Sequence, residues 1–398
     1  MLKLPSPAGR CVHRRTGLVA TGRSEVDAMA SLPKAAALPE AARPQSPDFT
    51  WTMPAEWYRS PDIFAKERAL VFTRNWMLFT WGERLKKPGD YVTGTVAGYP
   101  VFAIRGDDGR VRAFHNVCRH RGAQLLEGED GHCGKLVVCP YHAWSYDRAG
   151  RLAKARDFGG DAVFDKDEWS LYAIDCDEWR GLVFVRIERG DESLKSWLGP
   201  IDAMAADYPL EQQHYFMSKD REVDVDWKTY GDNYLECYHC QTMHPGLCAS
   251  LDIDKYTIDV HYDDRFFHLH APKREGGFTR GLYFYRFPVL MLNLYDWGSS
   301  IATVEPLGPG RIRHVNWYLF TDVSPEKAEE NRRSAEWSAQ IVTEDLDIIT
   351  GVQRNLNAGV YDRGPLSAKY EHAVLGFQTM CRDALSGGDP AERRLAAE

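Results

Sequence analysis

Hydrophobic and polar residues alternate with a period of two along much of the first half of the chain. The clearest case is residues 101–114, where two alternating runs flank a Gly-Asp-Asp-Gly sequence. Successive side chains of a strand point to opposite faces, and a Gly/Asp pair favours a tight turn, so this pattern predicts a β-hairpin. Residues 182–187 predict a further strand. Together these segments indicate a small all-β domain over residues 76–190.

The second half combines strand patterns with one long helical pattern. Residues 222–238 predict a strand followed by a helix, and residues 256–320 contain several strand-like runs. A helix start at Ser324-Pro325-Glu326 opens a helical segment that reaches about Leu356. Strands followed by a closing helix predict an α+β domain over residues 191–388.

Two segments precede these domains. Residues 51–75 include Ser60-Pro61-Asp62, which joins a capping hydroxyl, a first-turn proline and an acid, and they predict a helix that packs on the second domain. Residues 1–50 show no sustained period, and we expect a disordered tail or an over-extended gene start with Met29 as the initiator. A transit peptide is the alternative, although its acid-poor composition does not fit Glu25 and Asp27.

Composition narrows the classes of function. The 398 residues include 49 Lys plus Arg and 57 Asp plus Glu, a formal net charge of −8, which argues against a nucleic-acid partner. Since no run of about 18 apolar residues exists, we expect no membrane span. Nine cysteines favour metal ligation or free thiols over a disulfide framework, so we expect a cytoplasmic protein.

Cysteine and histidine alternate in two short motifs of the predicted β domain. Cys-Arg-His at residues 118–120 and Cys-Pro-Tyr-His at residues 139–142 are separated by eighteen residues. Structural zinc usually takes a pair of cysteines and then a pair of histidines. Alternation suits two irons of different ligation, two cysteines on one and two histidines on the other, as in a Rieske [2Fe–2S] cluster. The predicted ligands are Cys118, His120, Cys139 and His142, with zinc or metal-free burial as alternatives and His132 and Cys133 as bystanders.

A second cluster of metal-ligand residues lies in the second half of the chain. His239 and His244 are five residues apart, about 140° around an ideal helix, so both reach one metal only if the helix ends between them. Pro245 makes such an ending plausible. Two histidines and a carboxylate form the facial triad of non-haem Fe(II) oxygenases. Buried structural histidines are the alternative.

The two clusters together resemble the Rieske non-haem iron oxygenases of the ring-hydroxylase alpha-subunit type. The resemblance is carried by CRHRGAQL from residue 118, CPYHAWSY from residue 139 and NYLECYHCQTMHP from residue 233. Ala143 stands where this family most often has Gly. The resemblance implies a [2Fe–2S] Rieske cluster, a mononuclear Fe(II), dioxygen as co-substrate and a helix-grip-like α+β catalytic domain.

The same resemblance assigns further residues. Glu236, where most members have Asp, would link His239 to His142 of a neighbouring subunit in a homotrimer, and a solvent-facing helical Glu is the alternative. Asp345 would be the third ligand of the mononuclear iron, with Glu344 and Asp347 as competitors.

Two observations limit the chemistry further. No Gly-x-Gly-x-x-Gly follows a predicted strand, so the electrons would come from a separate flavin or ferredoxin-type reductase.

Three cysteines lie near the histidines in sequence, namely Cys237, Cys240 and Cys248, and one hypothesis is that one of them is a thiolate nucleophile. Because reactive thiols beside an oxygen-activating iron would oxidise, we expect small buried fillers instead.

The Glu-Cys-Tyr-His-Cys sequence resembles the branch of this family that oxidises quaternary ammonium compounds. Such cations are held by aromatic faces. Expected chemistry is hydroxylation of an N-methyl group with release of formaldehyde, and glycine betaine is the first choice on resemblance. The alternatives are an aromatic or other neutral substrate, with ring hydroxylation or O-demethylation, and, more remotely, a protein that only transfers electrons. The candidate aromatic residues are Tyr283, Phe284, Tyr285, Phe287, Tyr295 and Trp297.

Overall fold

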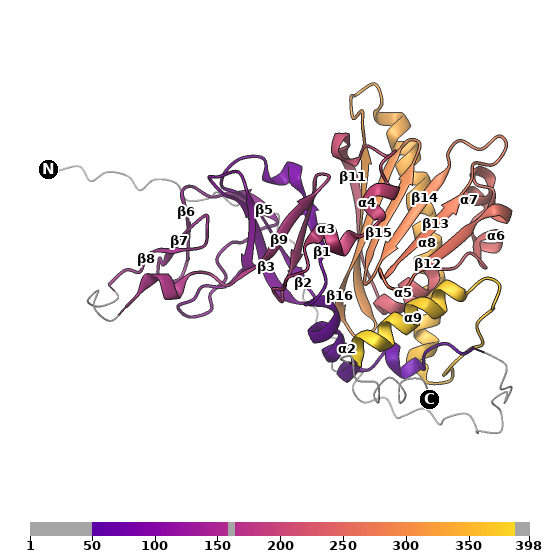
Figure 1. The fold of residues 1–398 in the computed structure, drawn as a ribbon, viewed down its shortest axis with the longest axis horizontal. Coiled ribbons are helices and arrows are strands. Elements are labelled where there is room, and N and C mark those ends of the chain that lie inside the picture. The colour runs from indigo at the N-terminus through magenta and orange to yellow at the C-terminus, as the bar shows by residue number, and fades with distance from the viewer. Residues whose placement is uncertain (1–49, 158–163, 387–398) are drawn as a thin grey trace, which may run out of the picture.

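The computed structural model describes residues 50–157 and 164–386. The tail expected over residues 1–50 lies outside this range except for Thr50. Figure 1 shows two sheet-containing parts of the molecule, with the helices α2 (Pro61–Glu67), α5 (Trp227–Tyr234) and α9 (His372–Leu385) gathered at one end of the second sheet. Within residues 50–157 and 164–386, no helix is both long and apolar enough to cross a membrane.

The first part is built on an antiparallel sheet of seven strands in the order β1-β10-β9-β4-β3-β2-β5. The hairpin predicted over residues 101–114 is confirmed, since Val101 pairs with His115 and Arg105 with Val111. The strand predicted over residues 182–187 is β10. The bounds are β1 Met77–Trp81, β2 Asp90–Val96, β3 Tyr99–Arg105, β4 Val111–His115, β5 Asp130–His132, β9 Ala173–Trp179 and β10 Leu182–Arg186.

A small sheet of three strands extends from this part, in the order β6-β7-β8. Its apolar face packs around Trp144 and Tyr146, both fully buried. The loop after β4 and the loop between β6 and β7 both pack on this buried aromatic cluster. The bounds are β6 Leu136–Val138, β7 Ser145–Asp147 and β8 Leu152–Lys154.

The second part is α+β, as predicted. Its antiparallel sheet has the order β11-β17-β16-β15-β14-β13-β12. Short helices α3 and α4 precede the sheet, α5, α6 and α7 interrupt it after β11, and α8 and α9 follow it. The strands are β11 His214–Val223, β12 Thr257–His261, β13 Phe266–Ala271, β14 Gly281–Arg286, β15 Leu290–Tyr295, β16 Gly298–Gly308 and β17 Arg311–Phe320. The helices are α3 Leu194–Leu198, α4 Ile201–Met204, α5 Trp227–Tyr234, α6 Cys240–Met243, α7 Pro245–Ser250, α8 Ala328–Ala358 and α9 His372–Leu385.

Helix α8 is the predicted closing helix and packs on β11 and α5. It begins four residues later than its sequence pattern predicts. Ser324 donates its backbone N–H to Asp322 Oδ1 at 2.9 Å, and Lys327 N–H donates to the Ser324 carbonyl at 3.1 Å. These bonds make a turn that precedes the helix, so residues 324–327 are not part of it.

The segment before the first sheet contains the predicted helix, α2 Pro61–Glu67, capped by the Ser60 side chain. Its last residue, Glu67, is buried and accepts from Lys228 Nζ at 2.6 Å. Asp226 Oδ1 lies 2.6 Å from the same ammonium. Because a buried charge is tolerated only when it is paired, this cluster fixes α2 against α5.

A second carboxylate, which is partly buried, holds α5 against α9. Asp232 accepts from Tyr58 Oη at 2.6 Å and from Gln378 Nε2 at 3.0 Å. Burial raises the pKa of Asp232 from 3.8 to about 7, and the hydrogen bonds from Tyr58 and Gln378 only partly oppose the rise. The neutral carboxyl is therefore the form that suits this position.

We expect the free energy of unfolding to carry a pH dependence from Asp232. The unfolded chain ionises this group near pH 4, whereas the folded chain keeps it protonated up to about pH 7. Stability is therefore lost as the pH rises from about 4 to about 7. Asp232→Asn should remove this loss, gaining about 2–4 kcal/mol on the wild type between pH 4 and pH 8 in urea unfolding. The exposed Asp224→Asn is the control, and a gain no larger than that of the control would contradict the assignment.

Candidate metal centres

Two buried cysteines face each other between the loops of the first part. Cys118 follows β4 and Cys139 follows β6. Cys118 N–H donates to the Ala123 carbonyl at 2.8 Å, and Cys139 N–H donates to the Trp144 carbonyl at 2.8 Å, so each loop is a closed turn. Burial, reinforced by the neighbouring Cys118 thiol, raises the pKa of Cys139. A bound metal ion would stabilise Cys118 and Cys139 in their thiolate forms.

Two histidines complete this group. The rings of His120 and His142 lie 4.7 Å apart between centroids, and His120 stacks on Trp144. His142 Nδ1 is buried and has no hydrogen-bond partner. A buried nitrogen without a partner costs free energy unless something binds it. Two thiols and two imidazoles in this arrangement fit an iron–sulfur cluster with two cysteines on one iron and two histidines on the other.

Ala143, which stands where the family most often has Gly, lies in the loop at Cys139. Its φ is +59°, a left-handed conformation that glycine adopts without strain and alanine does not. Ala143 N–H nevertheless donates to the Cys139 carbonyl at 3.1 Å, so the turn keeps its closure. His132, treated as a bystander, lies instead against Asp90, with its Nδ1 2.9 Å from Asp90 Oδ1.

The second group of ligand atoms lies between α5 and α8. His239 precedes the single turn α6, and His244 stands between α6 and α7. The predicted helix end lies at His244: α6 fills the four positions between the histidines and ends at Met243, and His244 has left the helical conformation, with φ −118° and ψ 70°. Their Nε2 atoms lie 3.1 Å apart.

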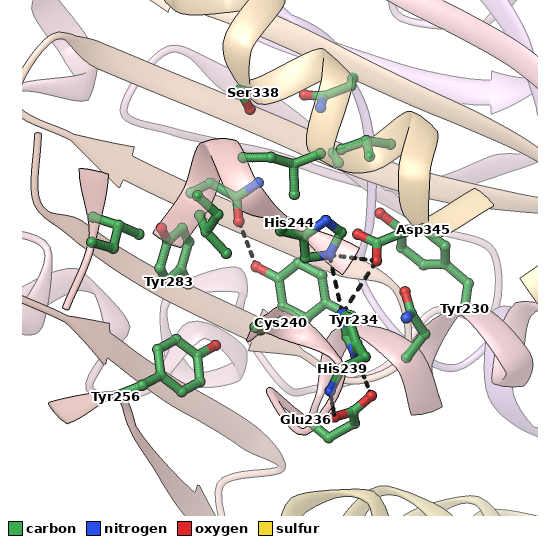
Figure 2. A pocket seen from close by; sticks show the side chains of 18 of the residues that line it. Tyr230, Tyr234, Glu236, His239, Cys240, His244, Tyr256, Tyr283, Ser338 and Asp345 are labelled. Carbon is green, nitrogen blue, oxygen red and sulfur yellow. Dashed lines mark hydrogen bonds and ion pairs between the residues drawn. The ribbon is translucent and has the colours of Figure 1, made fainter. Parts of the chain in front are cut away.

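Asp345 of α8 meets both imidazoles. Its Oδ1 is 3.0 Å from His244 Nε2 and 3.3 Å from His239 Nε2 (Figure 2). All three ligand atoms lie within 4.8 Å of one another. Burial would raise the pKa of Asp345, but the two histidines outweigh it and hold that pKa below its usual value. Two imidazole nitrogens and one carboxylate oxygen on a common side fit Fe(II) with open positions.

The two competing acids, Glu344 and Asp347, lie outside the group of three ligand atoms. Glu344 Oε2 is 2.7 Å from His244 Nδ1, the nitrogen that faces away from Asp345. A carboxylate in that place fixes the orientation of a metal-binding imidazole. Asp347 is exposed. Of these three acids, Asp345 is the one placed to bind the metal, and we propose it as the third ligand.

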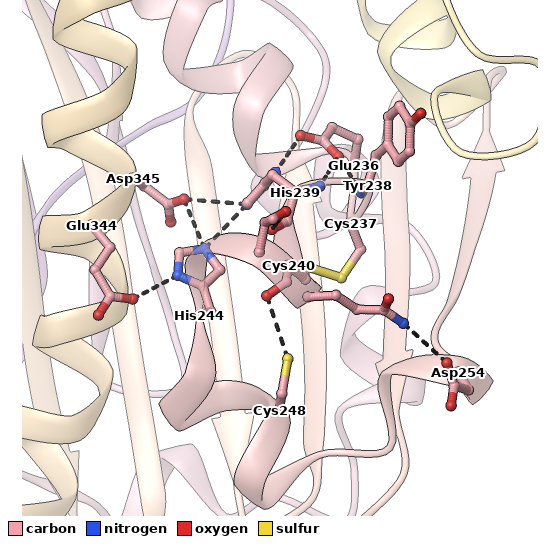
Figure 3. Close-up of a disulfide and its surroundings, with 12 residues drawn as sticks. Glu236, Cys237, Tyr238, His239, Cys240, His244, Cys248, Asp254, Glu344 and Asp345 are labelled. Atoms are coloured by element: carbon pink, nitrogen blue, oxygen red, sulfur yellow. Dashed lines mark hydrogen bonds and ion pairs between the residues drawn. A yellow bond between two sulfur atoms is a disulfide. The ribbon is translucent and has the colours of Figure 1, made fainter.

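Glu236 lies in the loop between α5 and α6 and not on a helix, which corrects the helical placement expected from sequence. Its carboxylate accepts backbone N–H groups from Tyr238 and His239 and contacts His239 Nδ1. Figure 3 shows it on the side of His239 away from Asp345. Glu236 therefore orients His239 in the same way that Glu344 orients His244.

The structure joins Cys237 and Cys240 in a disulfide, and this corrects the expectation of separate buried fillers (Figure 3). The loop folds back after Leu235, so that their Cα atoms lie 5.0 Å apart, a spacing that suits a disulfide. Cys248 is free, and its thiol donates to the Cys240 carbonyl at 3.3 Å. The disulfide thus encloses the loop that carries His239.

A cavity of about 90 Å³ adjoins the three ligand atoms. Tyr283 and Tyr295, two of the aromatic residues predicted from sequence, line it. Sequence analysis missed three other tyrosines of its wall. Two of them lie four residues apart on the predicted helix before His239, a spacing that places side chains on one face and could have identified them. The missed residues are Tyr230, Tyr234 and Tyr256.

The remaining aromatic candidates lie outside this cavity. Tyr285 and Phe287 pack on Phe377 of α9, because α5 and α9 cover that end of the sheet. Trp297 stacks on Tyr295 at an interplanar angle of 11° and supports that wall residue from behind. A run of aromatic residues in sequence is therefore divided between the core and the cavity. Phe284, also a candidate, belongs to the buried core on the other side.

Comparisons with known proteins agree with both centres. Residues 75–164 match the Rieske [2Fe-2S] domain, and residues 210–281 and 270–387 match the catalytic domain of the ring hydroxylating alpha subunit. The carnitine monooxygenase oxygenase subunit of Acinetobacter pittii is 31% identical over 360 residues, covering 84% of this chain and 94% of that protein. The chloroplastic choline monooxygenase of Arabidopsis thaliana is 28% identical over 334 residues, covering 79% and 78%.

Solved structures show the same likeness. The quaternary ammonium Rieske monooxygenase CntA in complex with L-carnitine has a TM-score of 0.75 and 28% identity, covering 84% of this chain and 95% of that one. A structure of a quaternary ammonium Rieske monooxygenase, described in terms of carnitine oxidation by gut microbiota and inter-subunit electron transfer, has a TM-score of 0.75 and 27% identity, covering 86% and 98%. Naphthalene 1,2-dioxygenase, at 18% identity and a TM-score of 0.69, covers 87% and 95% and shares the fold.

Removal of the Asp345 carboxylate should empty the mononuclear iron site and leave the cluster in place. Anaerobically purified protein should hold about three irons per chain, two in the cluster and one mononuclear. Asp345→Ala should lower this to about two irons, because two imidazoles alone bind Fe(II) weakly, and should leave the visible absorption of the cluster unchanged. Asp347→Ala, on the same helix, is the matched control. Loss of iron in the control but not in Asp345→Ala would contradict the assignment.

Proposed function

This chain belongs to the Rieske oxygenases with a ring-hydroxylating alpha-subunit catalytic domain, and from that premise we propose that it hydroxylates an N-methyl group of a quaternary ammonium compound. Its cofactors are a Rieske [2Fe–2S] cluster and a mononuclear non-haem iron. The observation that carries the proposal is the tyrosine-lined cavity directly beside His239, His244 and Asp345. Relatives named for carnitine and choline support the substrate class.

The cavity suits a trimethylammonium group. Such a cation has no N–H donor and is held by the faces of aromatic rings. Burial raises the pKa of Tyr230, Tyr234 and Tyr256, so these rings stay neutral. Glu236 and Asp345 would offset the two positive charges of the iron when it is bound, which leaves the metal end close to neutral. The attraction for the cation therefore comes from the faces of the neutral aromatic rings.

The protein's residues then place the reacting methyl group. His239, His244 and Asp345 would hold the mononuclear iron, which supplies the activation of dioxygen when bound. Tyr234, on the cavity wall, donates to Asn293 Oδ1 and so keeps a fixed orientation. One dioxygen, two electrons and two protons convert the N-methyl group to a carbinolamine and one water. The carbinolamine then releases formaldehyde and leaves a tertiary amine.

The electrons are proposed to come from a separate reductase and to pass between subunits of a homotrimer. Glu236 contacts His239 and lies beside the exposed Tyr238, so it lies between the metal ligands and the surface. We propose that it links His239 to His142 of a neighbouring subunit. A relative described in terms of inter-subunit electron transfer supports this route.

The experiment that tests the proposed function is a formaldehyde assay over a panel of quaternary amines. Glycine betaine, the compound favoured from sequence, is included together with carnitine and choline. With a reductase and NAD(P)H, at least one of them should release one formaldehyde for each dioxygen consumed. If none does so while a neutral aromatic compound is hydroxylated, the proposed substrate class is wrong.

Glu236→Gln should slow turnover while leaving both metal centres in place. The amide oxygen still accepts the backbone N–H groups of Tyr238 and His239, but the charge between the centres is lost. We expect turnover to fall by about 10–100-fold, the range for partners of metal-binding histidines. Stopped-flow spectra should show the reduced cluster persisting when substrate and dioxygen are added. Glu336→Gln, on the exposed face of α8, is the control, and turnover of Glu236→Gln equal to that control would exclude the bridging role.

A further inference from the structure

The loop that carries His239 is closed by a covalent bond as well as by hydrogen bonds. The disulfide between Cys237 and Cys240 encloses only two residues, and His239 is one of them. Glu236, directly before the disulfide, accepts the backbone N–H groups of Tyr238 and His239. Because His239 is one of the three metal-ligand candidates, the geometry of the metal site depends on whether this small ring is closed.

This disulfide is isolated within the chain. The other six cysteines of the described residues form no disulfide, and two of them, Cys118 and Cys139, are the predicted cluster ligands. A protein stabilised by disulfides pairs its cysteines throughout, whereas a disulfide in a protein that keeps its other thiols free is usually one that opens and closes with the redox state. The Cys237–Cys240 bond is therefore a candidate for reversible reduction.

The disulfide is accessible from two directions. Cys237 is half-buried and lies beside Tyr238, which is 61% exposed. Cys240 is buried, but it lines the cavity that adjoins the three ligand atoms. Figure 3 shows Cys237 on the side of His239 away from Asp345. A small thiol thus meets the pair from the surface or through the cavity, and the second route does not depend on whether a neighbouring subunit covers Tyr238.

A third cysteine lies next to the pair and serves as a comparison. The Cys248 thiol donates to the Cys240 carbonyl at 3.3 Å and takes no part in the disulfide (Figure 3). Cys248 belongs to α7, after the second histidine, and encloses no ligand residue. Serine at this position keeps a hydrogen-bond donor. Cys248→Ser is therefore a matched control for the loss of one cysteine near the metal site.

We propose that Cys237 and Cys240 form a reversible thiol–disulfide pair that controls how tightly the site of three ligands binds its metal. In the closed form, the four-residue ring holds the backbone of His239 in place. In the open form, the loop keeps only its hydrogen bonds, including those to Glu236. The proposal concerns the metal site and does not depend on the substrate class.

The exchange balances with a small thiol as the reductant. Two thiol molecules give up two electrons and become one disulfide, while the sulfur–sulfur bond between Cys237 and Cys240 breaks. The two thiol protons pass to the sulfur atoms of the protein, so that both cysteines end as thiols. The disulfide of the same small thiol reverses the reaction and closes the ring.

Closure of the ring should raise the affinity for the metal by about tenfold. The closed ring removes conformational freedom that the open loop would lose when His239 binds a metal, and chain-entropy arguments give at most about twentyfold for a ring of this size. The hydrogen bonds to Glu236 already remove part of this freedom, so we expect less than the full effect.

Alkylation followed by mass spectrometry tests whether the pair is reversible in the native protein. The anaerobic holoenzyme is treated with iodoacetamide before and after incubation with 2-mercaptoethanol. Neither Cys237 nor Cys240 should react before reduction, and Cys237, which is nearer the surface, should react after it. Incubation with bis(2-hydroxyethyl) disulfide should then protect both cysteines again.

Competition with a ferrous chelator tests the effect on the metal site. Once the small thiol has been removed anaerobically, the open enzyme should lose its mononuclear iron at about tenfold lower chelator concentration than the closed enzyme. The visible absorption of the cluster should stay unchanged. Cys237→Ser, which cannot close the ring, should match the open wild type before any thiol is added, and Cys248→Ser should match the closed wild type.

Four results would overturn the proposal. Alkylation of both cysteines before reduction would show that they are not joined, and a disulfide that opens only after unfolding in urea would be a permanent one. Equal iron retention in the open and closed forms would remove the control of the metal, and tighter retention in the open form would show a freed thiolate binding iron. If Cys237→Ser does not fold, the wild type opened by 2-mercaptoethanol still decides. Formaldehyde release by the closed enzyme tests the proposed function independently of these results.

Discussion

The candidate iron site depends on one tertiary contact, in which His239 and His244, after α5, lie against Asp345 of α8. Asp345 follows the two histidines by about 100 residues in the chain. Loops alone would not hold three ligand atoms within 4.8 Å of one another. Gln353, buried two turns after Asp345 on α8, fixes the two helices relative to each other. It accepts from Asp226 N–H and from Thr229 Oγ1 at the start of α5, and it donates to the Tyr58 carbonyl. One amide thus sets the rotation of α8 against α5 and the segment before the first sheet, and the ligand geometry follows from that rotation.

The same contact between the two histidines and Asp345 determines which side chains line each end of the cavity. Acids gather at the metal end, where Glu236 and Glu344 each orient one imidazole. Tyrosines and uncharged amides form the walls and floor, and burial raises the pKa of the tyrosines, so that they stay neutral. Neutral aromatic walls of this kind suit a cation without N–H groups, as the proposed function requires.

The sequence predicted the strands of the first sheet and the candidate metal ligands, and the physical reasons differ from one to the other. Alternation of hydrophobic residues revealed the hairpin of β3 and β4, and the spacing of His239 and His244 required a break in the helix. Asp345 was predicted from the family resemblance with Glu344 and Asp347 as competitors, and the structure supports that choice, because tertiary packing separates the directions of the three acids. The disulfide of Cys237 and Cys240 was missed, since a count of nine cysteines says nothing about which loops fold back. The aromatic residues from Tyr283 to Trp297 were treated as one surface. In the structure α5 and α9 cover part of this run, and several tyrosines that line the cavity come from other segments of the chain.

Anomalous diffraction at the iron edge, from crystals of the iron-loaded protein soaked in choline, tests the central claim most directly. The account predicts an isolated iron in contact with His239 Nε2, His244 Nε2 and Asp345 Oδ1, and a separate pair of irons between Cys118, His120, Cys139 and His142. It also predicts trimethylammonium density against Tyr234 on the cavity side of the isolated iron. An iron bound by Glu344 or Asp347, or choline seated away from this cavity, would contradict the account.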